Sequence, residues 1–188
     1  MAASLTLPGG QGLRDNAEVA VPGAAIGLLA GLFAMAVGMM AGLAPAVTVT
    51  IAAGLGVPLA LFGAGYCVLL ARGVFGIGAV APLALYWFVG FPLSRLIDSY
   101  AVAAVLGSDT VLDEPLLSFL ALQAMLSFGF TIGFLWLHER IAPRWLLRVR
   151  DHNAVAADLV ERYMEHAAHL NQRRGARGPR RKPSKNNS

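Results

Sequence analysis

The stretch from Pro115 to Arg150, PLLSFLALQAMLSFGFTIGFLWLHERIAPRWLLRVR, decides the fold class. It contains no charged residue between Leu116 and Leu137. A run of about 20 apolar residues is long enough to cross a bilayer as a helix. Several arginines follow the run directly, and positive residues beside a span mark its cytoplasmic end. The stretch therefore predicts a membrane helix with a fixed orientation.

The composition of the whole chain points the same way. Of its 188 residues, 56% are hydrophobic and only 14% are charged, whereas soluble domains carry about 25% charged residues. Between Val19 and Ser94 the only charged residue is Arg72. Residues 139–188 hold 12 of the 15 lysines and arginines but 5 of the 11 acids. These features predict a multi-pass membrane protein with a basic C-terminal region, and they exclude a soluble globular domain.

Reading along the chain predicts four spans, at about residues 21–43, 47–70, 74–93 and 116–137. Four spans place both termini in the cytoplasm, and the distribution of basic residues agrees with that orientation. Five spans, with the N-terminus outside, are the alternative. The predicted all-α organisation is a flexible leader, a four-helix transmembrane domain, a cytoplasmic amphipathic helix and a disordered basic tail, at residues 1–19, 20–140, 141–171 and 172–188.

The third span can be divided in two ways. In the first, Pro92 and Ser94 end the span at Leu93, and residues 95–106 lie at the outer interface. In the second, the span extends towards Leu106, and Arg95 and Asp98 enter the bilayer. Both divisions pair these two residues, because positions i and i+3 share a helix face. An ion pair inside the bilayer marks a candidate functional site.

The first span carries a regular stripe of small residues that predicts a helix-packing seam. Spacings of three and four place them on one face of a helix, where small side chains let two backbones approach closely. The partner helix is either in this chain or in another subunit. The stripe consists of Gly23, Gly27, Gly31, Ala34, Gly38 and Gly42.

The fourth span carries a narrow polar stripe at Gln123, Ser127 and Thr131. These side chains are expected to bond to their own helix or within the bundle, since unpaired polar groups in a bilayer are costly. A polar path through the membrane is the alternative. Cys67 is the sole cysteine, so no internal disulfide forms, and it is interpreted as a small buried apolar side chain.

The region after the fourth span predicts two contacts. Arg140, Arg144 and Arg148 recur at every fourth position and form a comb that fits anionic lipid headgroups. Pro143 is expected to begin a new helix, and Asn153 is a suitable N-cap for the amphipathic segment that follows. The polar face of that segment is mainly acidic, which favours a protein partner over a membrane surface. The face expected to bind it contains Val155, Leu159, Tyr163 and Leu170.

No motif for nucleotide binding, hydrolysis, redox chemistry or metal binding occurs in the chain, so no enzymatic activity, cofactor, metal or nucleic acid is expected. An Ala-, Gly- and Arg-rich composition with few lysines favours a bacterial inner-membrane protein. In general form the chain is similar to small accessory subunits of bacterial membrane machines, such as respiratory supercomplexes or mammalian-cell-entry type lipid importers. We therefore expect a non-catalytic accessory or assembly subunit. The alternative is a small oligomeric channel or transporter, with its polar path at Gln123, Ser127, Thr131, Arg95 and Asp98.

Overall fold

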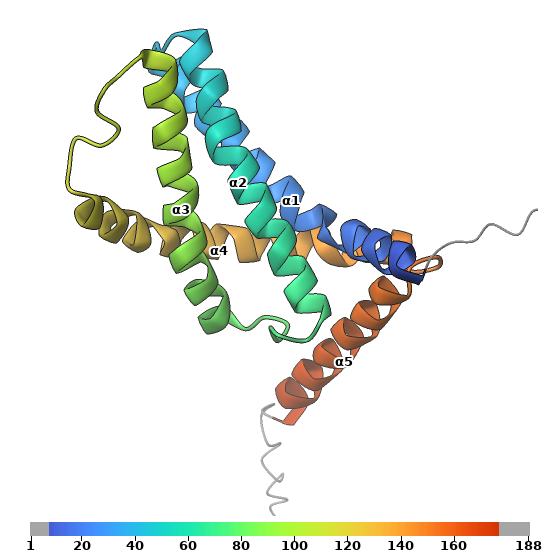
Figure 1. Cartoon of the computed structure of the whole chain (residues 1–188). Helices are drawn as coiled ribbons and strands as arrows, with labels where there is room; N and C mark the ends of the chain where they lie inside the picture. The colour runs from blue at the N-terminus through green and yellow to red at the C-terminus, as the bar shows by residue number, and fades with distance from the viewer. Residues whose placement is uncertain (1–7, 177–188) are drawn as a thin grey trace, which may run out of the picture.

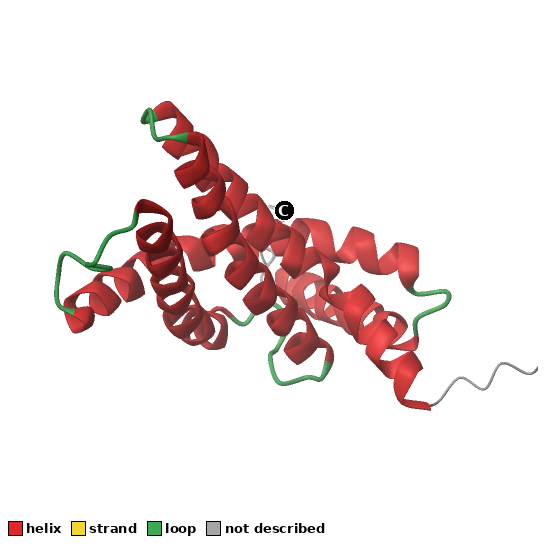
Figure 2. Cartoon of the chain, turned by 45° about the horizontal axis from the view of Figure 1, so that its top comes forward, coloured by secondary structure: helices red, strands yellow, loops and turns green. Residues whose placement is uncertain are grey.

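The computed structural model describes residues 8–176, which form α-helices joined by short loops (Figures 1 and 2). Four helices are long and apolar enough to cross a membrane, which confirms the predicted all-α, four-span class. The predicted basic tail, from residue 177 onwards, lies outside the described residues, as do residues 1–7. The helices are α1 (Pro8–Met40), α2 (Pro45–Ala71), α3 (Val80–Leu106), α4 (Leu116–Val149) and α5 (Ala154–Ala176).

The arrangement places α1 and α2 side by side as an antiparallel hairpin, with α3 against α2 (Figure 1). Helix α4 contacts both α3 and α1, and α5 folds back against α1, α2 and α4. We call the part of the molecule where α5 lies the α5 end. The core at the centre is rich in aromatic side chains, among them Tyr66, Trp87 and Phe134, each at most 1% exposed. These rings contact one another across α2, α3 and α4.

The surfaces of α1 to α4 are apolar. Large hydrophobic side chains such as Phe33, Leu61, Leu85 and Met125 are exposed on them. Monomeric soluble proteins rarely expose contiguous apolar surface beyond a few hundred Å², whereas acyl chains solvate such surface in a bilayer. Together with the length of the four helices, these surfaces fit a multi-pass membrane protein.

Helix α1 begins at Pro8, so the segment predicted as a flexible leader is largely helical. Arg14 Nε lies 3.4 Å from Glu18 Oε1, one helical turn away. Asn16 Nδ2 donates to the Gly12 carbonyl at 2.6 Å. Val19 is buried in the core, at 1% exposure. Local bonds and burial against the rest of the chain therefore order this segment. The Arg14–Glu18 spacing was the sequence signal for a helix here.

The predicted end of the third span at Pro92 and Ser94 is wrong. Helix α3 starts at Val80 and continues through Pro92 to Leu106. Pro92 removes only one backbone hydrogen bond, and Ser94 Oγ donates to the Gly90 carbonyl at 2.8 Å within the same helix. Gly107, at φ +63°, ends the helix in the left-handed conformation that glycine adopts without strain. Arg95 and Asp98 therefore lie inside one continuous helix.

A second proline prediction also fails. Helix α4 passes through Pro143 without interruption and ends at Val149, so no new helix begins at Pro143. Ala142 and Leu146, on either side of the proline, are at most 2% exposed. Burial of this face stabilises the continued helix, and it offsets the single lost backbone bond. The amphipathic helix begins only at Ala154.

Candidate functional site

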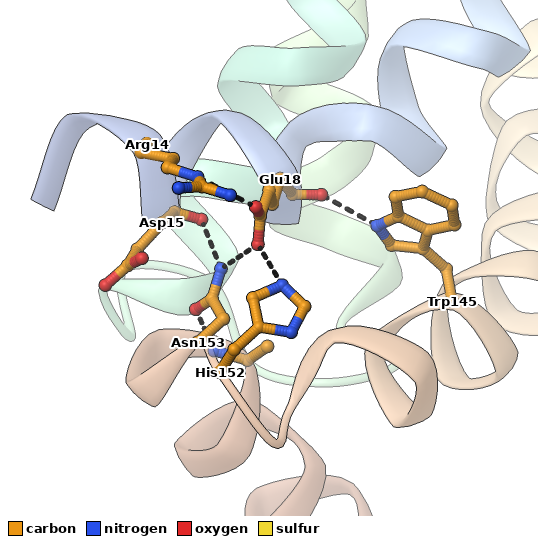
Figure 3. A network of polar contacts seen from close by, with 7 residues as sticks. Arg14, Asp15, Glu18, Trp145, His152 and Asn153 are labelled. Atoms are coloured by element: carbon orange, nitrogen blue, oxygen red, sulfur yellow. Dashed lines mark hydrogen bonds and ion pairs between the residues drawn. The ribbon is translucent and has the colours of Figure 1, made fainter. Parts of the chain in front are cut away.

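Residues far apart in the sequence meet in a polar junction at the α5 end (Figure 3). Trp145 Nε1 of α4 donates to the Glu18 carbonyl of α1 at 2.8 Å. Asn153 Nδ2, just before α5, donates to the Asp15 carbonyl and to Glu18 Oε2, both at 3.0 Å. His152 Nε2 lies 3.1 Å from the same carboxylate oxygen. One turn of α1 thus holds both the end of α4 and the start of α5.

Asn153 has two functions in the polar junction. Its Oδ1 accepts the Ala156 backbone N–H at 2.9 Å, which is the predicted N-cap of α5. Its amide nitrogen meanwhile binds α1. The side chain is 1% exposed, so both ends of the amide are satisfied inside the protein. No feature of the local sequence indicated the contact with α1.

Arg162 fixes α5 to a second helix. Its Nη1 donates to the carbonyls of Leu70 and Ala71, both at 3.0 Å. These carbonyls belong to the last turn of α2, where carbonyl groups lack helical partners and a positive charge is favoured. One turn of α5 therefore caps the end of α2.

Tyr163 adds a contact between α5 and α4. Its hydroxyl donates to Glu139 Oε1 at 3.5 Å. Burial raises the pKa of Tyr163, and the neighbouring Glu139 carboxylate raises it further. The hydroxyl therefore remains protonated at neutral pH, and it can donate its hydrogen to the Glu139 carboxylate.

We expect Arg162→Gln to loosen α5 from the end of α2, because two carbonyls in the last turn of α2 lose a charged donor. Amide hydrogen exchange in α5 and in residues 72–79 should rise by about tenfold or more, the effect of losing a charged hydrogen bond. Arg148→Gln is the control, since Arg148 is exposed on α4. Exchange rates that stay unchanged in Arg162→Gln would contradict the capping role.

Most of the apolar face of α5 packs against the chain itself, which differs from the sequence-based prediction of an external partner. Val155, Leu159, Tyr163 and Leu170 were expected to find their partner outside the chain. Leu159 is 2% exposed, and Val155 and Tyr163 pack against the chain's own core. The turn at residues 150–153 folds α5 back on the bundle, a reversal that helical periodicity does not reveal. Leu170, at 45% exposure, remains uncovered.

The predicted packing stripe of α1 meets α2 of the same chain. A Cβ added to Gly23 would lie 2.0 Å from the Gly63 carbonyl oxygen, and one added to Gly27 would lie 2.2 Å from the Ala60 nitrogen. At Gly31 the nearest atom would be 2.5 Å away. Only glycine permits these backbone approaches, so these contacts define a glycine seam between α1 and α2.

The remaining members of the stripe contribute less to the seam. Ala34 is partly buried against the core. A Cβ on Gly38 would meet only side chains, the closest being Thr48 Cγ2 at 3.2 Å. Gly42 has a φ of +78° and no atom within 4 Å of an added Cβ. It belongs to the turn between α1 and α2, where a positive φ requires glycine.

The polar stripe of α4 is buried, and its two hydroxyl groups bond to their own helix. Gln123, Ser127 and Thr131 are at most 7% exposed. Ser127 Oγ donates to the Ala124 carbonyl at 2.6 Å, and Thr131 Oγ1 donates to the Ser127 carbonyl at 2.8 Å. The two hydroxyl groups thus satisfy their donors locally, as polar groups in membrane helices commonly do.

The arginine comb lies on one side of α4. Arg140, Arg144 and Arg148 are all exposed. The Arg140 guanidinium stacks over the Trp136 ring, 4.4 Å from its centroid. Ion pairs between the comb and an acidic side chain are absent from the described residues. The comb therefore presents free positive charge along the last third of α4.

Arg95 and Asp98 pair across one turn of α3, through Arg95 Nη1 and Asp98 Oδ2. Asp98 is 3% exposed, and its Oδ1 has no hydrogen-bond partner in the described part of the chain. Gly54 of α2 faces it, since a Cβ added there would lie 3.1 Å from Oδ1. Both charged residues line a cavity of about 380 Å³ that Ser99 and Asp113 also border. We call this the α3 cavity.

Comparisons with known proteins give no match. Neither a protein-family model, nor a curated protein, nor a solved structure resembles the chain. Within residues 8–176 no group of three or more His, Cys, Asp or Glu side chains is placed to hold a metal ion. The function proposed below therefore depends on the geometry of the chain itself.

A buried cysteine–histidine pair escaped the sequence analysis. Cys67 Sγ of α2 lies 3.3 Å from His138 Nε2 of α4, and both residues are at most 2% exposed. The imidazole packs against Tyr66 and Phe134, with ring centroids 5.1 and 5.8 Å away. The sequence alone does not indicate the pair, because 71 residues separate Cys67 from His138. Among the described residues, His138 Nδ1 has no hydrogen-bond partner, and both side chains pack in the core.

Proposed function

We propose that the chain is a non-catalytic accessory or assembly subunit of a larger bacterial inner-membrane complex. The observation that carries this proposal is the half-covered apolar face of α5. Its first half is fixed to the bundle through the polar junction and Arg162. Beyond Tyr163 the same face continues through Ala167 to Leu170, which are exposed. A fixed helix with an open apolar stripe suits the groove of a partner protein.

The charges on α5 favour a protein partner over the bilayer surface. Asp158, Glu161 and Glu165 are exposed on its outer side. A helix that lies on anionic lipid carries lysine and arginine there instead. The partner is then another integral subunit of the complex, or a second copy of the chain, that reaches the C-terminal half of α5.

The arginine comb of α4 supplies the contact with lipid. Arg140, Arg144 and Arg148 are exposed at the end of the last membrane helix, where anionic headgroups meet basic side chains. By the positive-inside rule this end faces the cytoplasm, and so do both termini. The comb therefore anchors α4 at the membrane surface from which α5 departs.

The channel or transporter alternative has weaker support. A polar path needs side chains that are free to bind a solute or ion. The hydroxyls of Ser127 and Thr131 are instead engaged by their own helix. Arg95 and Asp98 remain available beside a cavity, but they lie on α3 and extend no path into α4.

Leu170→Glu tests the accessory function. A carboxylate in the open apolar stripe should prevent docking, because it would be buried without a partner charge. Affinity purification of the full chain from native membranes, followed by quantitative mass spectrometry, should show the partner at about equal molar amount with the parent chain and at least about tenfold less with the variant.

Ala168→Glu is the matched control for this experiment. Ala168 is exposed on the opposite side of α5, so the variant adds the same charge to the same helix outside the stripe. Retention of the partner by Ala168→Glu and its loss from Leu170→Glu would support the proposal. Purification of the parent chain without any stoichiometric partner would reject it.

A further inference from the structure

The α3 cavity gathers charged side chains that the proposed accessory function does not use. It lies between α2, the second half of α3 and the loop at residues 107–115, and Ile51, Arg95, Asp98 and Asp113 are among its walls. Its volume of about 380 Å³ falls within the range of about 300–1,000 Å³ that small-molecule sites occupy. The cavity can therefore hold a compound or a headgroup much larger than water.

The charges around the cavity favour a cation. Arg95 and Asp98 neutralise each other as an ion pair. Asp113, from the loop, adds a second carboxylate, and no second basic residue lines the described cavity. This excess negative charge attracts a positive group to the cavity.

The unpaired oxygen of Asp98 indicates that the ligand donates hydrogen bonds. Asp98 is 3% exposed, and its Oδ1 accepts no bond from the described residues. A buried carboxylate oxygen left without a donor is costly, and native proteins seldom keep one without a purpose. Oδ1 lies against Gly54 of α2, and the broad last side-chain torsion of aspartate lets the carboxylate turn towards a donor in the cavity.

The remaining walls limit the size and shape of the ligand. Val102, Leu106 and Val111 give the cavity an apolar side, which suits the carbon atoms beside a charged group. Arg95 uses one N–H group in the ion pair, and its side chain is 32% exposed. Its other N–H groups can meet an anionic group carried by the same ligand, such as a phosphate.

We propose that the α3 cavity binds a primary ammonium group held by the carboxylates of Asp98 and Asp113. The group belongs either to an aminophospholipid headgroup or to a small soluble amine. A primary ammonium supplies one positive charge and three N–H donors, which match the excess charge and the unpaired oxygen. A quaternary ammonium supplies the charge without the donors, and it therefore binds weakly.

Native mass spectrometry of the full chain in detergent tests this assignment. The protein is titrated with phosphatidylethanolamine and with phosphatidylcholine of identical acyl chains, and soluble ethanolamine is added as a competitor. We expect the primary ammonium lipid to bind about tenfold more tightly, the usual effect of charge-assisted hydrogen bonds. Equal retention of both lipids overturns the proposal. Retention of neither lipid, together with no binding of ethanolamine itself, also overturns it.

Asp113→Asn removes the loop carboxylate at an exposed position, where circular dichroism should show an unchanged fold. It should weaken ethanolamine-lipid binding by about tenfold. Asp109→Asn, in the same loop but outside the cavity wall, should leave binding unchanged. An equal loss in both variants overturns the assignment to this cavity.

The competitor distinguishes the two sources of the ammonium group. Displacement of the lipid by soluble ethanolamine, or binding of ethanolamine alone, assigns the site to a soluble amine. Lipid binding that resists excess ethanolamine assigns it to the bilayer. Both results support an ammonium site, and both are independent of the partner that α5 binds.

Discussion

Gly27→Ala should destabilise the protein by about 3 kcal/mol, the upper range for overpacking a tight interface. The added Cβ would lie 2.2 Å from the Ala60 nitrogen and 2.3 Å from the Leu59 carbonyl carbon. These are backbone atoms, so no side chain can rotate away and α1 must move off α2. Alanine favours helix over glycine by about 1 kcal/mol, which the steric overlap exceeds. Denaturation in detergent micelles, followed by circular dichroism, measures the loss.

Gly133→Ala is the matched control for the seam. It makes the same substitution in membrane helix α4, where no atom lies within 4 Å of an added Cβ. Its stability should be unchanged or increased by up to about 1 kcal/mol, since only helix propensity changes. If the two variants unfold at the same denaturant concentration, the glycine seam does not limit the stability of the fold.

Asn153→Ala should release α5 from the bundle. The variant loses the N-cap of α5 together with both bonds to α1. Loss of a cap costs about 1 kcal/mol, and buried hydrogen bonds add about 1–3 kcal/mol. Amide exchange throughout α5 should rise by about a hundredfold, while the centre of the α1–α2 hairpin keeps its protection.

Two further variants separate the cap from the contact with α1. Asn16→Ala is a control, because the Asn16 amide bonds to the Gly12 carbonyl of its own helix. Asn153→Asp retains an oxygen that can cap α5, but it loses the amide donor and places a carboxylate beside Glu18. We expect Asn153→Asp to expose α5 nearly as much as Asn153→Ala. Protection equal to that of the parent chain would show that capping alone holds α5.

The class of the fold could be predicted from sequence because lipid imposes a simple requirement. Long uncharged runs must form helices to satisfy their backbone groups, and α2 begins and ends within two residues of its predicted bounds. Helix ends near proline were predicted less well. Pro92 and Pro143 are potential breaks by local rules, yet both lie inside continuous helices, because burial of neighbouring side chains stabilises each helix beyond the break.

Contacts between distant segments could not be predicted. The glycine spacing of α1 indicated a close-packed face, but Gly63 and Ala60 as its neighbours follow only from the hairpin geometry. The polar junction joins Glu18 with Trp145 and Asn153, which lie 127 and 135 residues away. Periodicity describes the faces of single helices, and it contains no information about which faces meet.

The separation of Glu18 from its partners also sets an order of events during synthesis. Chains fold from the N-terminus as they emerge, so α1 and α2 can form their hairpin early. Glu18 can bond to Trp145 and Asn153 only after these residues have been synthesised and α4 has been placed. The polar junction therefore closes late, as does the contact of Arg162 with the end of α2. Its closure distinguishes a fully threaded chain from one whose fourth helix has failed to insert, and only the former gives α5 a fixed position.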